Sequence, residues 1–189
     1  MSGAAAPMPY RFTRKEYYRL GEAGFFDDKR VELLDGEIIA MAPQNPPHAG
    51  TTNRIAHTLL RLLGTAVTIR IQSSIVLDDW SEPEPDIAIC RLDLDDYRRE
   101  HPKANDVLLV IEVADTSLAY DRGRKVAAYA SSSIAEYWIV NLADECVEVL
   151  SDPDPTARLY RQERRAFAGD TLLLPERTAL AVADILPRP

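Results

Sequence analysis

The amino-acid sequence predicts an α/β fold in which a mixed central β-sheet is flanked by helices and preceded by an antiparallel hairpin. Asp35-Gly36 separates the apolar runs Val31–Leu34 and Glu37–Met41, and Asp-Gly between such runs indicates a hairpin. Val107–Val113 is apolar on both faces apart from one residue, which is typical of a central strand. Residues 119–141 then read as a helix and a second buried strand, and two strands joined by a helix pair in parallel.

The remaining elements follow in chain order. Residues 1–9 are expected to form a short disordered lead, and residues 10–189 a single domain, since this length suits one hydrophobic core. Thr13 is the expected N-cap of a first helix, with Glu16 completing a capping box. In order along the chain, we expect helices over Thr13–Leu20, His48–Leu63 and Ala119–Ala130, a polar helix or loop over Leu92–Asn105, and strands over Thr68–Leu77, Asp86–Arg91, Val107–Val113, Glu136–Asn141, Cys146–Leu150, Leu159–Glu163 and Thr171–Leu174.

Composition limits the classes of protein to which the chain can belong. None of its apolar runs is long enough to span a bilayer and its start is unlike a secretory signal, so no membrane partner and a cytoplasmic location are expected. Cys90 and Cys146 lie in apolar runs and are expected to be buried thiols. The net charge of -8 argues against a general nucleic-acid binder, because phosphate contacts favour a basic surface. A metal site that gathers carboxylates is compatible with this charge.

Two acidic residues interrupt apolar strands. Glu112 lies inside the central run, where a carboxylate is costly to bury unless it is paired or binds a metal. Asp86 begins a short apolar strand directly after Pro85. Carboxylates from neighbouring strands can converge on one hard cation, so the pair indicates a site for Mg²⁺ or Mn²⁺. The alternative for Asp86 is a role in the turn that starts its strand.

Lys125 is one of only four lysines, and it follows the Glu112 strand on the next helix. Asp121, Lys125 and Tyr129 recur every four residues and therefore share one helix face. On the inner face of that helix, Lys125 can orient an attacking water and stabilise developing charge, with Asp121 orienting the lysine. Two alternatives stay open. Glu112 can pair with Arg122 or Arg124 in a structural role, and Asp121 with Lys125 can form an ordinary surface ion pair.

Three segments carry a resemblance to a known family. They are RVELLDGEIIAMAP with His48 after it, EPEPDIAI, and VLLVIEVADTSLAYDRGRKVAAYASSSIAEYWIVN. Together they resemble the Uma-type family of putative restriction endonucleases, in the PD-(D/E)XK nuclease superfamily, over roughly Tyr10 to Leu174. The usual lysine of the superfamily, two residues after the acid, is Ala114 here, and in the Uma-type pattern Lys125 takes its place. Asn141 and Ser133 stand where the family usually has aspartate and glycine.

The resemblance implies a restriction-endonuclease-like fold, a magnesium-type ion, hydrolysis of DNA phosphodiester bonds and a homodimer. Asp86 and Glu112, with the backbone carbonyl of Val113, are the implied metal ligands, and Asp86, Glu112 and Lys125 are the catalytic group. No organic cofactor is expected. The alternatives are a non-catalytic binding or scaffold module that retains the nuclease fold, and a metal-dependent hydrolase of smaller phosphoesters.

Further polar residues are candidates for supporting roles beside Asp121. By resemblance, Glu32 lies near the acids and helps to hold the metal or its water; an exposed strand position beside Arg30 is the alternative. Gln72, expected in mid-strand, can donate a hydrogen bond to a metal-coordinated water or to DNA, or simply face solvent. His48 has no histidine partner at metal spacing, so a capping role or a substrate contact is favoured over ligation.

Overall fold

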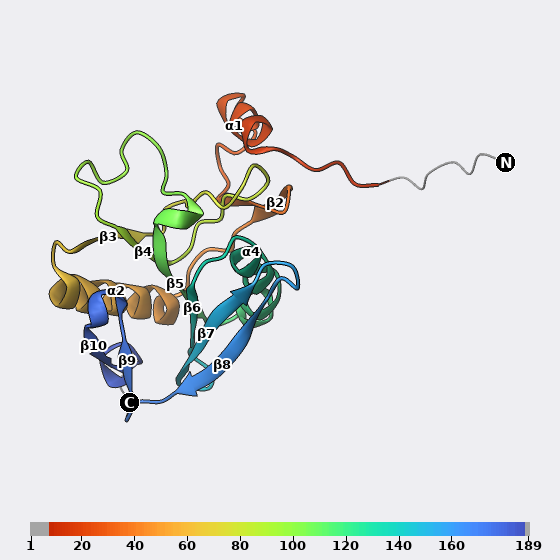
Figure 1. Cartoon of the computed structure of the whole chain (residues 1–189). Helices are drawn as coiled ribbons and strands as arrows, with labels where there is room; N and C mark the ends of the chain where they lie inside the picture. The colour runs from red at the N-terminus through yellow and green to blue at the C-terminus, as the bar shows by residue number, and fades with distance from the viewer. Residues whose placement is uncertain (1–7, 188–189) are drawn as a thin grey trace.

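The computed structural model describes residues 8–187. The expected disordered lead over residues 1–9 lies outside this range except for Met8 and Pro9. Figure 1 shows the chain as a central sheet with helices on both sides. The strands are β1 (Val31–Leu34), β2 (Glu37–Ala40), β3 (Val67–Ile71), β4 (Ile87–Arg91), β5 (Val107–Ala114), β6 (Glu136–Asn141), β7 (Cys146–Asp154), β8 (Leu159–Ala166), β9 (Thr171–Leu173) and β10 (Ala179–Ala181). The α-helices are α1 (Arg14–Glu22), α2 (Pro46–Leu63), α3 (Leu118–Tyr120) and α4 (Val126–Ser131).

The central sheet is mixed, as the sequence predicts. Its six strands run in the order β3-β4-β5-β6-β7-β8. Strands β5 and β6 pair in parallel, with Glu112 beside Ile139, whereas the other neighbours in this sheet are antiparallel. The apolar run that forms β5 therefore lies inside the sheet with a strand on either side, which confirms its predicted central position.

The hairpin and the first helix are also confirmed. Strands β1 and β2 pair antiparallel around Asp35-Gly36. Gly36 has a φ of +75°, and a Cβ built there would lie 2.6 Å from the Cβ of Arg11, so the turn requires glycine. Thr13 caps α1 and forms a capping box with Glu16, as expected from their spacing.

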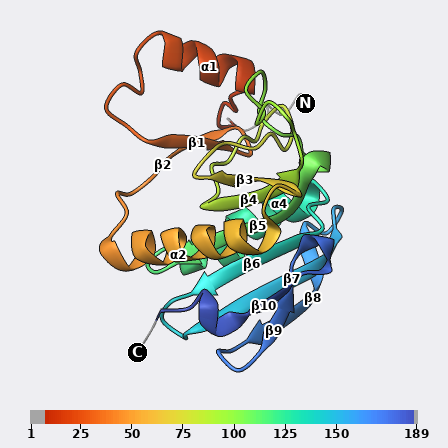
Figure 2. The same ribbon diagram turned by 90° about the vertical axis from the view of Figure 1, so that its left-hand side faces the viewer.

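The two faces of the sheet are covered by different helices. Helix α2 packs on one face, where Ile55 and Leu59 join an apolar cluster that also contains Ile111. Helix α4 packs on the opposite face, where Tyr129 joins a second cluster with Tyr137. Figure 2 shows α2 running across the front of the sheet and α4 behind it. No helix of the described residues is long and apolar enough to cross a membrane.

Two predicted elements are wrong in detail, and a third was left open between helix and loop. Helix α2 begins at Pro46 rather than His48, because Asn45 is the N-cap and both prolines fit the first helical turn. Strand β3 ends at Ile71, so Gln72 is not in mid-strand; it has a φ of 47° and leaves the sheet. The polar stretch after β4 is a loop that ends in a short 3₁₀-helix, Ala104–Asp106, which settles the choice left open for that segment.

The predicted helix over Ala119–Ala130 is a composite. Helix α3 is followed by a π-helical turn over Asp121–Lys125 and then by α4. Such π turns are uncommon and often occur at functional sites. At the C-terminal end, β9 is paired with β10, which the sequence pattern does not predict. Both strands contribute residues to the α2 side of the core.

Candidate functional site

Asp86 and Glu112 face each other across two neighbouring strands. In the β4–β5 ladder Ala88 is opposite Val110. Because side chains alternate along a strand, moving two residues along each strand places Asp86 opposite Glu112 on the same face. The backbone N–H of Asp86 donates to Glu112 Oε2 at 3.1 Å. Both residues are buried, at 8% and 5% exposure, so two carboxyl groups share one confined space.

The backbone around Asp86 fixes this geometry. Pro83 and Pro85 flank Glu84, and a proline favours an extended conformation in the residue before it. The chain therefore enters β4 in an extended form and places Asp86 at the end of the ladder. There the N–H of Val113 donates to Asp86 Oδ2 at 2.9 Å. Strand β5 continues beyond its pairing with β4, and there the carboxylate of Asp86 accepts the backbone N–H that β4 does not bind.

Lys125 reaches the same acids from the π-helical turn. Its Nζ donates to Glu112 Oε1 at 3.0 Å and to Glu32 Oε2 at 2.8 Å. The residue is only 3% exposed, and Glu32 is 2% exposed. Glu32 is therefore not the exposed residue of the alternative interpretation. It comes from the hairpin and connects that hairpin to the lysine.

The proposed pairing of Asp121 with Lys125 is wrong. Asp121 is buried on the same side, but its Oδ2 accepts from the hydroxyl of Ser117 at 2.6 Å. No ion pair joins Asp121 to Lys125 in the part of the chain that the structure describes. The reason is the length of the lysine side chain, which carries Nζ past its helical neighbour to acids on two strands.

The structural alternative for Glu112 does not hold either. Arg122 forms a two-pronged ion pair with Glu148, with Nε 2.8 Å from Oε2. Arg124 pairs instead with Glu37 on the hairpin, at 2.9 Å. Both arginines point away from Glu112, whose cationic partner is Lys125.

Two tyrosine hydroxyls complete the network. Tyr129 donates to Glu112 Oε1 at 2.8 Å, and Tyr120 donates to Glu32 Oε1 at 2.9 Å. The four-residue spacing from Lys125 places Tyr129 on the helix face from which it joins this network. Sequence reasoning missed Tyr120, whose only signal is its position one residue before Asp121.

His48 and Gln72 both lie against Asp86. His48 Nε2 is 3.0 Å from Asp86 Oδ2. The amide of Gln72 donates to Asp86 Oδ1 at the longer distance of 3.3 Å. Gln72 is held there because its own backbone N–H donates to the carbonyl of Asp86. Asp86 Oδ2 therefore accepts from two groups, whereas Oδ1 accepts from one weak donor and keeps a free lone pair.

A cavity of about 780 Å³, including the space open to solvent, gives access to this group. Among the described residues, its acidic lining consists of Glu32, Glu84, Asp86, Glu112, Asp115 and Asp121. Arg30, Lys125 and His48 are the basic residues of the lining. Carboxylates therefore outnumber the formal positive charges, and the interior of the cavity attracts cations.

Burial, and to a smaller extent the neighbouring acids, raises the pKa values of two acidic residues in the cavity. Burial raises the pKa of Glu112, and the charges of Asp86, Asp121 and Glu32 raise it further against the opposing effect of Lys125. Burial also raises the pKa of Asp121 to about 6, although its hydrogen bond from Ser117 and the charge of Lys125 lower it. A cation beside these groups would favour their ionised forms.

Burial and the acids act in opposite directions on the basic residues. Burial alone lowers the pKa of Lys125, but Glu112 and Glu32 outweigh burial and raise it above its ordinary value. For His48, burial is likewise outweighed by Asp86, so the pKa is raised. Lys125 is therefore a cation at neutral pH, suited to donating hydrogen bonds rather than to accepting a proton.

The backbone of β5 adds a carbonyl to the possible donors. Leu142 N donates to the carbonyl of Ala114 at 3.0 Å, so the polar groups of Ala114 face β6. Backbone groups of successive strand residues face opposite sides. The N–H of Val113 donates to Asp86 Oδ2, and strand geometry places the carbonyl of the same residue on the same edge of β5. Asp86 and Glu112 thus offer carboxylate oxygens, the type of ligand that Mg²⁺ prefers.

A second group of metal-binding residue types lies at the β6–β7 turn. Asp144, Cys146 and Glu148 place one ligand atom each within 4.8 Å of one another. Glu148, however, already accepts from Arg122 and from the amide of Asn141 at 2.9 Å. Burial raises the pKa of Cys146, which keeps its thiol protonated. This group is therefore an ion-pair network rather than a metal centre.

Comparison with known proteins places this geometry in context. The family model Uma2, described as "Putative restriction endonuclease", matches residues 14–183. Among solved structures, the chain is similar to one described as a putative nuclease belonging to DUF820 from Anabaena variabilis ATCC 29413. The two share 13% identity with a TM-score of 0.67, over 92% of this chain and 97% of the other. At this identity the similarity establishes the fold, and it confirms the nuclease-like α/β prediction. No curated protein matches the chain.

Proposed function

The chain belongs to the Uma2 family, described as putative restriction endonucleases, and we propose that it is a metal-dependent endonuclease that hydrolyses DNA phosphodiester bonds. One observation carries the proposal. Asp86 and Glu112 face each other in a cavity rich in carboxylates, and Lys125 donates to Glu112 from the adjoining helix. Two acids can hold the metal ion that assists phosphodiester hydrolysis, and a lysine can supply further positive charge.

We propose Mg²⁺ or Mn²⁺ as the ion. Asp86 Oδ1 and Glu112 Oε2 each keep a free lone pair, because their hydrogen bonds leave room for one more partner. With the Val113 carbonyl, they would hold the ion at the cavity wall. When bound, the ion would polarise the phosphoryl oxygen and lower the pKa of a water molecule.

The other residues position these ligands. His48 and the N–H of Val113 occupy Asp86 Oδ2, which turns Oδ1 toward the cavity. Tyr129 and Lys125 both donate to Glu112 Oε1, whereas Oε2 accepts only from the N–H of Asp86 and keeps a lone pair for the ion. The orientation of each carboxylate is therefore fixed before an ion binds, which reduces the cost of reorganisation.

Lys125 supplies positive charge where an anion must react. An ammonium group has three donors, and Glu32 and Glu112 take two of them. The third can orient the attacking water and stabilise the charge that develops on the phosphate. Glu32 is thus a positioning residue that holds Lys125, rather than a metal ligand.

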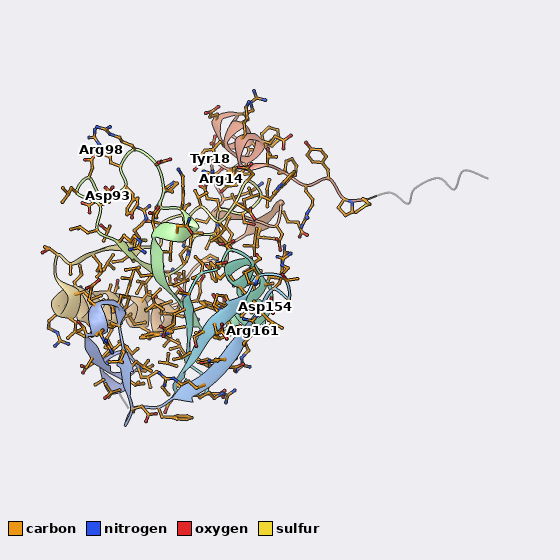
Figure 3. All side chains as sticks on the ribbon, in the orientation of Figure 1. Arg14, Tyr18, Asp93, Arg98, Asp154 and Arg161 are labelled. Carbon is orange, nitrogen blue, oxygen red and sulfur yellow. The ribbon has the colours of Figure 1, made fainter. Side chains whose placement is uncertain are left out.

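A non-catalytic binding module is the competing function, favoured by the surface charge. Several basic side chains are neutralised by acids. Arg161 lies beside Asp154 on the β7–β8 hairpin, 2.9 Å apart (Figure 3). Arg14 pairs with Glu82, which also accepts from the hydroxyl of Tyr18. Such pairing weakens general attraction for phosphates. The network around Glu112 favours the enzyme, because a binding module does not need an oriented pair of acids.

A cleavage assay separates the two functions. Purified protein would be incubated with single-stranded, double-stranded and branched DNA, with Mg²⁺, with Mn²⁺ or with EDTA. We expect cleavage that depends on the metal and is lost in Glu112→Gln, with Glu37→Gln as the matched exposed control. Absence of cleavage on every substrate, or equal cleavage by Glu112→Gln, would contradict the proposal.

Three further parts of the proposal rest on sequence alone. The family resemblance supports a homodimer, which sedimentation velocity would test. The composition supports a cytoplasmic location, which fractionation of cells would test. A single cooperative unfolding transition would support one domain over residues 10–189.

A further inference from the structure

We propose that Arg30 binds a phosphate of the nucleic-acid strand beside the metal site and exchanges its present partner, Glu84, for that phosphate. This inference rests on the proposed function, because it assigns a substrate contact to the same cavity. Arg30 directly precedes β1, and its carbonyl accepts from the N–H of Met41 at 2.9 Å. Its backbone is thus anchored at the open end of the hairpin.

The charge of the cavity creates the need for such a residue. Six carboxylates line it in the described part of the chain, so an anionic strand is repelled unless positive charge faces it. Lys125 cannot meet an incoming strand at the mouth, because its side chain is 4% exposed and held by two acids. His48 is turned toward Asp86 and is 16% exposed. Arg30, at 43% exposure, is the cation of the lining that faces solvent.

The geometry of Arg30 suits exchange of partners. Its Nη2 forms an ion pair with Glu84 Oε1. A guanidinium has five donors in a planar fork that fits two phosphate oxygens at once. One carboxylate on an exposed guanidinium leaves most of these donors free, and an exposed ion pair of this kind is weak enough to open.

Glu84 connects Arg30 to the metal site through the backbone. It lies two residues before Asp86 between two prolines, and its N–H donates to Glu32 Oε2 at 3.0 Å. Two residues of extended chain span about 6–7 Å. Arg30 is therefore held within one or two nucleotides of a phosphate at Asp86, which suits a neighbouring phosphodiester rather than the one that is cleaved.

Arg124 provides a matched control. Like Arg30 it is partly exposed, at 37%, and pairs with a single carboxylate, Glu37, at 2.9 Å. Unlike Arg30 it does not line the cavity. Replacing either arginine with glutamine removes one surface ion pair, and for Arg124 also a 3.3 Å hydrogen bond to the carbonyl of Leu34. A general effect of charge or folding should therefore be at least as large in the Arg124 variant.

The test measures DNA binding apart from cleavage. Affinity for a fluorescent single-stranded DNA would be measured with Mg²⁺ at several salt concentrations, in a Glu112→Gln background designed to prevent turnover while keeping the buried charge of Lys125. Arg30→Gln should weaken binding about 10-fold or more, the effect of losing a hydrogen bond to a charged group. The slope of log affinity against log salt should fall by about 0.7. Arg124→Gln should change neither, Arg30→Lys should keep the salt slope, and Glu84→Gln should tighten binding.

The outcomes separate this inference from the proposed function. Cleavage by wild-type protein with unchanged KM and salt slope in Arg30→Gln would overturn the role of Arg30 and leave the nuclease standing. Binding that depends on Arg30 without any cleavage would support Arg30 and contradict the nuclease. Equal losses in Arg30→Gln and Arg124→Gln, or no DNA binding by the wild type and the background variant, would overturn the inference.

Discussion

Replacing Lys125 with methionine tests whether the buried network is an ion pair that the fold depends on. Lys125 is 3% exposed and is shared by Glu32 and Glu112, which are 2% and 5% exposed. Methionine keeps the unbranched stem and removes the charge. Breaking a buried pair by removing one partner costs about 3–5 kcal/mol. For a domain of this size, each kcal/mol lowers the Tm by about 2–4 °C, so a fall of roughly 6–20 °C is expected.

The assay is thermal and urea unfolding followed by circular dichroism, without divalent ions. Arg124→Gln is the control, because its exposed pair with Glu37 should contribute no more than about 1 kcal/mol. A double-mutant cycle with Glu32→Gln isolates the pair, and we expect a coupling of about 1–3 kcal/mol. If Lys125→Met unfolds within about 1 kcal/mol of wild type and the coupling is near zero, the ion-pair interpretation is refuted.

Three other substitutions test separate parts of the account. Glu112→Gln keeps the shape of the side chain but removes a ligand charge, so calorimetry should detect no Mn²⁺ binding while circular dichroism stays native; retained binding would exclude Glu112 as a ligand. Tyr129→Phe removes the hydroxyl that donates to Glu112 at 2.8 Å, and urea unfolding should show a loss of about 1.5–3 kcal/mol; an unchanged midpoint would contradict the hydrogen bond. Burial raises the pKa of Glu148, but the hydrogen bonds and charge of Arg122, with the hydrogen bond from Asn141, outweigh burial and lower the pKa below its ordinary value. The ionised Glu148 side chain therefore stabilises the fold above the ordinary glutamate pKa of about 4.3, and this stabilisation is lost as the pH falls through the lowered pKa. Glu148→Gln should lose less stability than the wild type on acidification. Parallel curves of stability against pH for the two proteins would contradict this.

Strand periodicity was sufficient to bring Asp86 and Glu112 together. Each acid interrupts an apolar run, and alternation along β4 and β5 places both on one face once the two strands pair. The hairpin and the capping box of α1 depend on neighbouring residues, so local rules predict them well. The hairpin and the capping box therefore need no knowledge of contacts between residues distant in the sequence.

The partners of Lys125 could not be predicted in the same way. A spacing of four residues favours Asp121, whereas the long side chain reaches Glu32, which lies 93 residues earlier in the chain. Only tertiary packing of the hairpin against the helix creates that contact. The π-helical turn that carries Lys125 likewise has no clear sequence signal, because helical periodicity describes regular turns. Gln72 was misplaced because β3 ends one residue earlier, at Ile71, and the positive φ of Gln72 has no signal in the sequence pattern.

The measurement that tests the central claim most directly is a Mn²⁺ titration followed by electron paramagnetic resonance. The wild-type protein should bind Mn²⁺ at one site, and Mg²⁺ should displace it. Asp86→Asn and Glu112→Gln should each abolish this binding while circular dichroism shows a native fold. No binding by the wild type, or binding that both variants retain, would contradict the proposal that Asp86 and Glu112 hold a catalytic metal ion.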